Sequence, residues 1–387
     1  MRTVGIVTVA RSDYGIYVPI LRRLQAEPEI HFYLLVSGMH LSPEFGLTVS
    51  TIEADGFEIG ERIEMLLSSD TPEGMAKSIG VGVLGFAQAY ARRRPDMLVV
   101  LGDRFEMAAA ALAAIPFKIP IAHVHGGEVT QGAIDDVLRH TLTKVSHLHF
   151  AATADYARRV RQLGEEAWRV MVSGAPSLDN VRTTPLLARS AFEAQYHLRV
   201  DPAPLLVTFH PVTLEYEQTA WQMHELLAAL ELVDLPVVFT LPNADTQSRV
   251  IMRLIEDYVR QHPQAQCVTT LGTQGYFSMM ALASAMVGNS SSGLIEAPTF
   301  ALPVVNIGSR QAGRVRAANV LDVSYHRADI VAAIRRAVSA EFRASLGGLV
   351  NPYGDGHAAA GIVARLTSIA IDDRLMRKVF QDYDVCL

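Results

Sequence analysis

The chain has 387 residues, half of them hydrophobic, and a formal net charge of −6 at pH 7. Because this length exceeds what one hydrophobic core usually organises, two globular domains are expected, and the absence of a Lys/Arg excess excludes a nucleic-acid binder. Two cysteines, Cys267 and Cys386, are too few for a disulfide framework, which favours a reducing, cytoplasmic setting.

Short β-rich runs alternate with helical patterns through the first half of the chain. The predicted strands are 4–9, 32–36, 97–101 and 119–124, with further runs at 149–152 and 170–172. The predicted helices are 18–24, 74–93, 106–114 and 136–146. This alternation predicts βαβ units and a parallel sheet. Every apolar stretch is broken well before the roughly 18 residues that a membrane span needs, so we expect no membrane partner.

The pattern restarts after a predicted linker at 182–185. Strands are predicted at 204–209, 236–241, 285–288 and 304–307, and helices at 218–230 and 247–261. The sequence therefore predicts an α/β protein of two Rossmann-like domains, residues 1–182 and 183–366, that face a cleft. Ligands of open parallel sheets bind at the carboxyl ends of the strands, so the loops there are expected to hold the chemistry.

Charged side chains follow two strands of the first half. Arg11 and Asp13 come after strand 4–9 and open a helix, where an arginine and free backbone N–H groups can bind a diphosphate. The alternative is that Asp13 caps that helix. Asp103 and Arg104 come after the buried strand 97–101. A charged group is costly there, so the two residues are expected either to have a function or to cap the next helix.

A histidine-rich segment follows the next strand. His123 and His125 are placed on the same side of a strand by its period of two, and Gly126, Gly127 and Glu128 come next. The pair suggests a metal, but no third spaced His or Cys is evident, so we expect no metal and no cofactor.

The helix after this segment also begins with charged residues. Asp135 and Arg139 share one face of it, and Asp135 and Asp136 are either functional or plain acids at a helix N-terminus.

The second half repeats the arrangement with fewer charges. His210 ends a strand before Pro211, and Asn243 follows the next strand. Ser290 and Ser291 lie in a Gly/Ser-rich loop that opens a helix, which suits a phosphate through N–H groups and the helix dipole, or is an ordinary Ser-capped helix. Glu296, a turn inside that helix, can accept hydrogen bonds from ribose hydroxyls.

Seven ordered segments together resemble the hydrolysing UDP-N-acetylglucosamine 2-epimerases, in particular the bacterial branch that makes precursors of sialic and legionaminic acids. The resemblance is carried by residues 11–14, 102–106, 123–128, 132–136, 210–213, 288–293 and 308–314. It implies a fold of the glycosyltransferase-B type, metal-free chemistry, a UDP-sugar as substrate, and a C-terminal helix within 367–387 that can cross back to the first domain. We also expect a homo-oligomer, either a dimer or a tetramer.

The resemblance implies a role for each matching residue. The nucleotide and substrate contacts are Arg11, Asp13, Arg104, Glu128, Arg139, His210, Asn243, Ser290, Ser291, Glu296 and Arg310. The acid/base candidates are Asp103 and Asp135, with His125 as a third group. His125 departs from the pattern of the animal-type members, which have a carboxylate at this position.

The sequence leaves several alternative functions open. A non-hydrolysing 2-epimerase would use the same fold, although that group resembles Gly-Thr-Arg-Pro-Glu where this chain has Ala10 to Tyr14. A glycosyltransferase of this fold would not need Asp103, His125 and Asp135, and a non-catalytic nucleotide-sugar sensor would leave them without a task. The acetamido sugar, including a 2,4-diacetamido-6-deoxy analogue, and the base, uridine or guanosine, are left undecided.

Overall fold

The structure is a computed structural model that describes residues 1–69, 71–131, 134–212, 215–242 and 248–383. The chain divides into two compact units. Unit 1 comprises Met1–Glu128, Ile134–Asn180 and Tyr353–Leu387, and unit 2 comprises Val129–Ala133 and Val181–Pro352. The chain leaves unit 1 within two residues of the expected boundary at 182, but it returns at Tyr353 rather than at 367. No helix of the described residues has the length and apolarity to cross a membrane.

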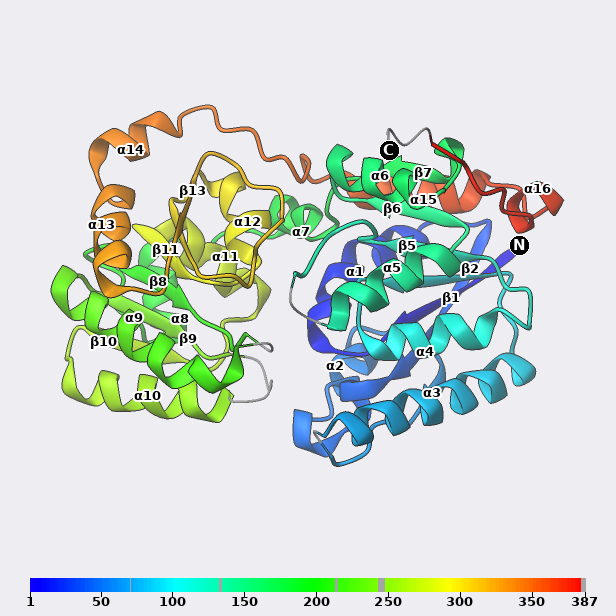
Figure 1. The fold of residues 1–387 in the computed structure, drawn as a ribbon, viewed down its shortest axis with the longest axis horizontal. Helices are drawn as coiled ribbons and strands as arrows, with labels where there is room; N and C mark the ends of the chain where they lie inside the picture. The colour runs from blue at the N-terminus through cyan, green and yellow to red at the C-terminus, as the bar shows by residue number, and fades with distance from the viewer. Residues whose placement is uncertain (70, 132–133, 213–214, 243–247, 384–387) are drawn as a thin grey trace. The chain divides into compact units, whose positions relative to one another are not determined.

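Unit 1 is built on a seven-stranded sheet in which every neighbouring pair is parallel (Figure 1). In spatial order the strands are β3 (Ile59–Ile63), β2 (Ile30–Ser37), β1 (Arg2–Thr8), β4 (Met97–Leu101), β5 (Ile121–Val124), β6 (Leu148–Ala151) and β7 (Val170–Val172). The order reverses between β1 and β4. In open α/β sheets such a reversal leaves a crevice at the carboxyl ends of the two strands, where ligands bind.

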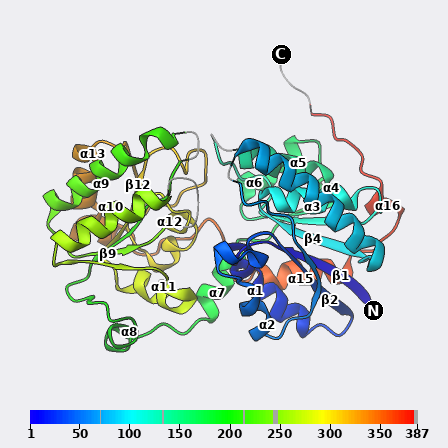
Figure 2. The ribbon, with the colours of Figure 1, turned by 90° about the horizontal axis from the view of Figure 1, so that it is seen from below.

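Helices cover both faces of this sheet (Figure 2). One face carries α3 (Pro72–Arg92), α4 (Phe105–Ala114), α5 (Ile134–Val145) and α6 (Ala154–Gln162). The other carries α1 (Arg11–Gln25), α2 (Val49–Ala54) and α15 (Ala358–Ser368). Because both faces are covered, the central strand β4 is apolar throughout, and all five of its residues are buried.

Unit 2 repeats the plan with six parallel strands. Their spatial order is β10 (Ala265–Val268), β9 (Val237–Thr240), β8 (Leu205–Thr208), β11 (Ala285–Gly288), β12 (Val304–Ile307) and β13 (Val320–Val323). The larger helices are α9 (Thr219–Val233), α10 (Ser248–Gln261), α11 (Gly272–Leu282) and α13 (Arg327–Ala337), and shorter ones are α8 (Arg189–Tyr196) and α14 (Ala340–Ser345). Here the order reverses between β8 and β11.

Two expectations about the joining segments are corrected. The predicted linker at 182–185 begins inside a helix, α7 (Ser177–Thr183). The last helix, expected within 359–378 and assigned with the segment 367–387, is divided: α15 ends at Ser368, and the Asp372 carboxylate caps a separate short helix, α16 (Asp373–Met376). This segment is part of unit 1.

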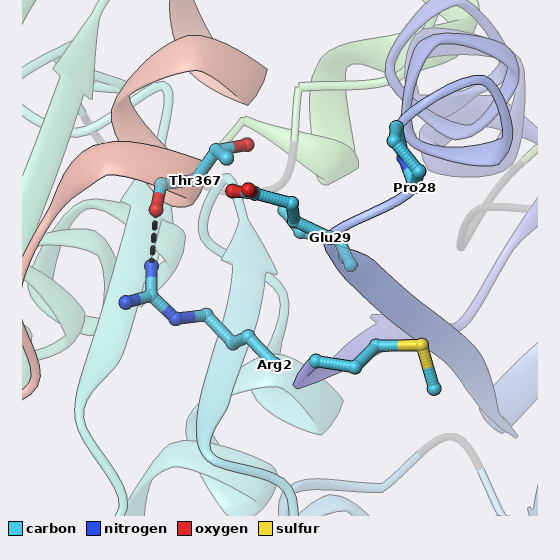
Figure 3. A pocket seen from close by; sticks show the side chains of 6 residues that line it. Arg2, Pro28, Glu29 and Thr367 are labelled. Atoms are coloured by element: carbon cyan, nitrogen blue, oxygen red, sulfur yellow. Dashed lines mark hydrogen bonds between the residues drawn. The ribbon is translucent and has the colours of Figure 1, made fainter.

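Backbone carbonyls of the C-terminal segment are held by two arginines of unit 1. Buried Arg169 donates to the carbonyls of Leu375 and Arg374, each at 2.8 Å. Arg2 donates to the Thr367 carbonyl at 3.1 Å, beside a cavity of about 380 Å³ at the amino end of β1 (Figure 3). Because the Arg2 guanidinium already binds carbonyls of the chain, we assign the cavity to the attachment of the C-terminal segment rather than to a ligand.

Candidate functional site

The loop after β1 uses Asp13 to begin α1. The Asp13 carboxylate accepts hydrogen bonds from the backbone N–H groups of Val9, at 2.9 Å, and Ala10, at 2.6 Å. Burial raises the pKa of Asp13 to about 6, while these N–H groups and the Arg104 charge act in the opposite direction. Both oxygens therefore serve the helix start in this structure, whereas Arg11 is exposed at the first position of α1.

Arg104, after β4, is fixed by a buried carboxylate. Its guanidinium donates to both oxygens of Glu106, at 2.9 and 3.1 Å, and Glu106 is fully buried. The Arg104 side chain is one-third exposed, so one edge of its guanidinium group stays accessible. Such a bidentate pair holds the planar group in one orientation, which suits recognition of a phosphate by its free edge.

Asp103 is paired with Arg139 of α5. The Arg139 side chain donates to the Asp103 carboxylate through one terminal nitrogen and to the carbonyl of His125 through the other, at 2.8 Å. Arg139 is 3 % exposed, so the ion pair lies largely out of water. The structure thus brings together the loops after β4 and β5 and the first turns of α5.

The charge of Asp103 affects the pKa of Asp135, which lies in the first turn of α5. Burial and then the charge of Asp103 raise the pKa of Asp135 to about 6, against the opposing influence of Arg104. Two neighbouring carboxylates at the carboxyl end of a sheet, one of which raises the pKa of the other, are typical of acid/base sites, because their environments separate their pKa values.

The two histidines of the 123–128 segment do not share a face as predicted. His123 lies inside β5, and its Nε2 donates to the Gly102 carbonyl oxygen at 2.8 Å. Burial lowers its pKa to about 3, so it is neutral. His125 lies beyond the end of β5 with φ +64°, and its Nδ1 is 2.5 Å from Oε1 of Glu128. The period of two fails because the strand ends at Val124.

Unit 2 places His210 and Asn289 side by side at its own reversal point. The Asn289 side chain accepts from the backbone N–H of His210, at 2.7 Å, and donates to the His210 carbonyl, at 2.8 Å. Arg310 and Gln311 both donate to the Asn289 carbonyl, at 3.1 and 2.8 Å. Burial, with the Arg310 charge, lowers the pKa of His210 to about 3, which leaves a neutral imidazole.

The serine loop after β11 opens a shorter helix than expected. Ser291 is the N-cap of α12 (Ser292–Ile295), which has four residues and is followed by a 3-10 helix with Pro298 in its first turn. Proline removes a donor and limits the α-helix. Ser290 is half-buried, and Glu296 is 9 % exposed at the end of α12. Asn243 lies outside the described residues.

Sequence reasoning missed three residues at these strand ends. His40 follows β2 and lies between Thr8, at 3.0 Å, and Thr48, at 2.7 Å, and burial lowers its pKa to about 4. Glu106 and Asn289 orient Arg104 and His210. A strand followed by Gly38 and then a histidine was the available signal for His40. Among the described residues, no group of three His, Cys, Asp or Glu side chains could hold a metal ion.

Comparison with known proteins places these features in a family. The model of the UDP-N-acetylglucosamine 2-epimerase family matches residues 22–367. The chain is 36% identical to the GDP/UDP-N,N'-diacetylbacillosamine 2-epimerase (hydrolyzing) of Campylobacter jejuni, over 88% of this chain and 89% of the relative. It is 35% identical to the UDP-N,N'-diacetylbacillosamine 2-epimerase (hydrolyzing) of Legionella pneumophila, over 98% and 99%.

A solved structure supports the fold. The Neisseria meningitidis UDP-GlcNAc 2-epimerase bound to UDP-GlcNAc superposes with a TM-score of 0.82 at 18% identity, covering 94% of this chain and 99% of the other. The expected fold, two Rossmann-like domains of the glycosyltransferase-B type, is confirmed at this level.

Proposed function

The chain belongs to the UDP-N-acetylglucosamine 2-epimerase family, and from this premise we propose that it is a hydrolysing 2-epimerase. Its substrate is a UDP-linked 2-acetamido sugar, and its products are UDP and the free sugar with the manno configuration at C2. The observation that carries the proposal is the likeness to the two hydrolysing relatives along nearly the whole chain. Because both are named for N,N'-diacetylbacillosamine, we propose a 2,4-diacetamido-6-deoxy sugar as the preferred substrate.

The reaction requires proton transfer at C2 and departure of a diphosphate. A base removes the C2 proton, the C–H electrons form the C1–C2 double bond, and the C1–O bond breaks with its electron pair on UDP. Water then adds its oxygen at C1, and an acid delivers a proton to the opposite face of C2. Two proton-transfer groups are therefore needed, and we propose that they are drawn from Asp103, Asp135 and His125 of unit 1.

We propose that unit 2 binds the nucleotide. His210, Ser290, Ser291, Glu296 and Arg310 provide neutral donors, hydroxyls, a carboxylate for ribose and one positive charge. Arg11 and Arg104 of unit 1 add positive charge for the departing diphosphate, whose developing charge such groups stabilise. Asn243, Asp13 and Arg139 stay predicted contacts from the resemblance, although Asp13 and Arg139 already bind partners within the chain.

Incubation with UDP-sugar and no acceptor tests the reaction. We expect UDP and a C2-inverted free sugar, with the 2,4-diacetamido-6-deoxy sugar turned over fastest in a panel of UDP- and GDP-linked acetamido sugars followed by NMR. In D₂O the released sugar should carry deuterium at C2, because the proton lost there is replaced from solvent. A C2 epimer still bound to UDP would indicate a non-hydrolysing epimerase, and UDP binding without turnover would indicate a transferase or a sensor.

Replacing Arg310 with Ala is expected to weaken UDP binding. Loss of a hydrogen bond to a charged group costs about 1–3 kcal/mol, which is roughly a 5- to 150-fold increase in Kd. Calorimetric titration with UDP measures the change. Arg335→Ala, at an exposed arginine of α13 in the same unit, is the control and should leave the affinity unchanged. Equal UDP affinity of Arg310→Ala and wild type would remove Arg310 from the nucleotide site.

Location and assembly are further proposals. We propose a cytoplasmic homo-oligomer, either a dimer or a tetramer. Sedimentation equilibrium of the purified protein, in which a monomer at micromolar concentration is the contrary result, tests the assembly.

A further inference from the structure

His125 adopts a backbone conformation that side chains other than glycine rarely take. Its φ of +64° lies in the left-handed region, directly after the last residue of β5. Residues held there cluster at functional sites, where the surrounding contacts fix them. The carbonyl of His125 is bound by Arg139, which also holds Asp103, so the turn is tied to the candidate acid/base residues.

The His125 ring has one partner and one bare nitrogen among the described residues. Its Nδ1 lies 2.5 Å from Oε1 of Glu128, and both side chains are more than nine-tenths buried. A carboxylate oxygen accepts, so Nδ1 carries the hydrogen. In the neutral ring Nε2 then holds the lone pair, and within the described ranges this buried atom has no hydrogen-bond partner.

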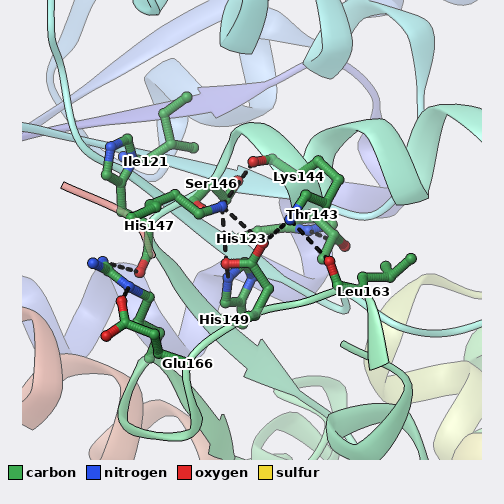
Figure 4. A network of polar contacts seen from close by, with 12 residues as sticks. Ile121, His123, Thr143, Lys144, Ser146, His147, His149, Leu163 and Glu166 are labelled. Atoms are coloured by element: carbon green, nitrogen blue, oxygen red, sulfur yellow. Dashed lines mark hydrogen bonds and ion pairs between the residues drawn. The ribbon is translucent and has the colours of Figure 1, made fainter. Parts of the chain in front are cut away.

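A second buried His–Glu pair in unit 1 shows what a structural pair looks like. His149 of β6 lies 3.1 Å from Glu165, and both side chains are fully buried. Lys144 and Lys378 also bind Glu165, at 2.7 and 2.8 Å, in a network that joins β6, α5 and the C-terminal segment (Figure 4). His149 also has a ring nitrogen with no partner in the described part of the chain, so an unpartnered nitrogen alone does not mark a site.

Position and charge distinguish the two pairs. Glu165 is compensated by two lysines and its histidine lies within a strand, whereas Glu128 has Arg139 at 3.9 Å and His125 follows a strand end. The carbonyl of His125 is bound by Arg139, which also donates to Asp103, so the turn that carries the His125 ring is held in place by the same arginine as Asp103. The His125–Glu128 pair therefore lies beside the candidate acid/base residues, whereas the His149–Glu165 pair lies within a network of lysines.

We propose that Glu128 is a positioning residue that holds His125 with Nδ1–H toward itself and leaves Nε2 as the nitrogen that exchanges a proton. This inference rests on the proposed function for its substrate. A proton accepted by the Nε2 lone pair gives an imidazolium whose charge is balanced by the Glu128 carboxylate, and Nε2 returns that proton to the sugar or to water. Glu128 was predicted to contact substrate, and here it acts through His125 instead.

The test combines kinetics with the spectrum of the ring. Glu128→Gln keeps the shape of the side chain but removes its charge, and we expect kcat to fall by at least about tenfold with KM within about threefold. In ¹⁵N-histidine-labelled wild type, the neutral His125 ring should be protonated at Nδ1, and Glu128→Gln should shift it toward protonation at Nε2. His125→Asn assigns the resonance by its disappearance.

Glu165→Gln is the matched control, because it alters the other buried His–Glu pair. It should lower the melting temperature while kcat and the His125 nitrogen signals stay as in wild type. A wild-type His125 ring protonated at Nε2, or a folded Glu128→Gln variant with unchanged kcat, would overturn the inference. If wild type released no free sugar from any nucleotide sugar, the proposed function would fail, but the nitrogen spectrum would still decide how Glu128 holds the ring.

Discussion

Replacing Asp103 or Asp135 with Asn is expected to lower turnover by about 10²–10⁴, the usual cost of losing a positioned acid/base group. UDP affinity should stay within a few fold, because neither carboxylate is among the proposed nucleotide contacts. Asn keeps the shape of the side chain and removes the base, so binding and chemistry are expected to separate. Turnover from single-turnover kinetics and UDP affinity from calorimetry measure the two effects on the same preparations.

The pKa of Asp135 sets the pH dependence of this prediction. Since burial and the Asp103 charge raise it to about 6, the carboxylate is mostly ionised at neutral pH and fits the role of base. Below pH 6 it becomes protonated, so kcat/KM should fall by about tenfold per pH unit, and this acid limb reports the free enzyme. In Asp135→Asn the residual activity should lack that limb.

Asp136→Asn provides the matched control. Asp136 follows Asp135 in the first turn of α5, and its nearest histidine partner is His140, at 3.6 Å. It has the same charge and a similar place in the helix, so general loss of helix-terminal charge would affect both variants alike. We expect near-normal turnover in Asp136→Asn. Near-normal turnover in both Asp103→Asn and Asp135→Asn would refute the assignment of the acid/base residues.

The apolar runs of the sequence located the central strands well. The predicted strands 97–101, 285–288 and 304–307 have the bounds of β4, β11 and β12, and of the edge strands only β7 was predicted, as the run 170–172. The sheet-edge strands β3, β10 and β13 were not predicted, because they are short and carry polar residues such as Glu61, Gln266 and Asp322. An edge strand is partly exposed, so its composition resembles that of a loop.

The contacts within the candidate site were less accessible to sequence reasoning. The carboxyl ends of strands were expected to hold the chemistry, and the predicted residues of unit 1 lie there. The pairing of Asp103 with Arg139 joins residues 36 positions apart and depends on how α5 packs. The left-handed conformation of His125 was not predicted, because a histidine adopts a positive φ only occasionally and the glycines beside it do so far more readily.

Replacing Arg139 with Met is expected to destabilise unit 1 by about 3 kcal/mol, because removing one partner of a largely buried ion pair is strongly destabilising. Arg139 is 3 % exposed, donates to Asp103 and to the His125 carbonyl, and lies 3.9 Å from Glu128. For a unit of this size the loss corresponds to a fall of about 6–12 °C in melting temperature. Scanning calorimetry measures it, and Arg139→Lys should recover only part, since a point charge cannot replace the two-pronged contact.

A control variant and a double variant separate the loss of the buried ion pair from the removal of any arginine side chain. Arg158→Met breaks an exposed pair with Asp155 on α6, where the side chains are 69% and 50% exposed, and should cost less than about 1 kcal/mol. In the double variant Asp103→Asn/Arg139→Met both partners of the ion pair are absent, so its melting temperature should exceed the value expected from adding the two single effects. Strict additivity would mean that Arg139 stabilises unit 1 through packing and the His125 carbonyl, and that Asp103 does not depend on it for charge compensation.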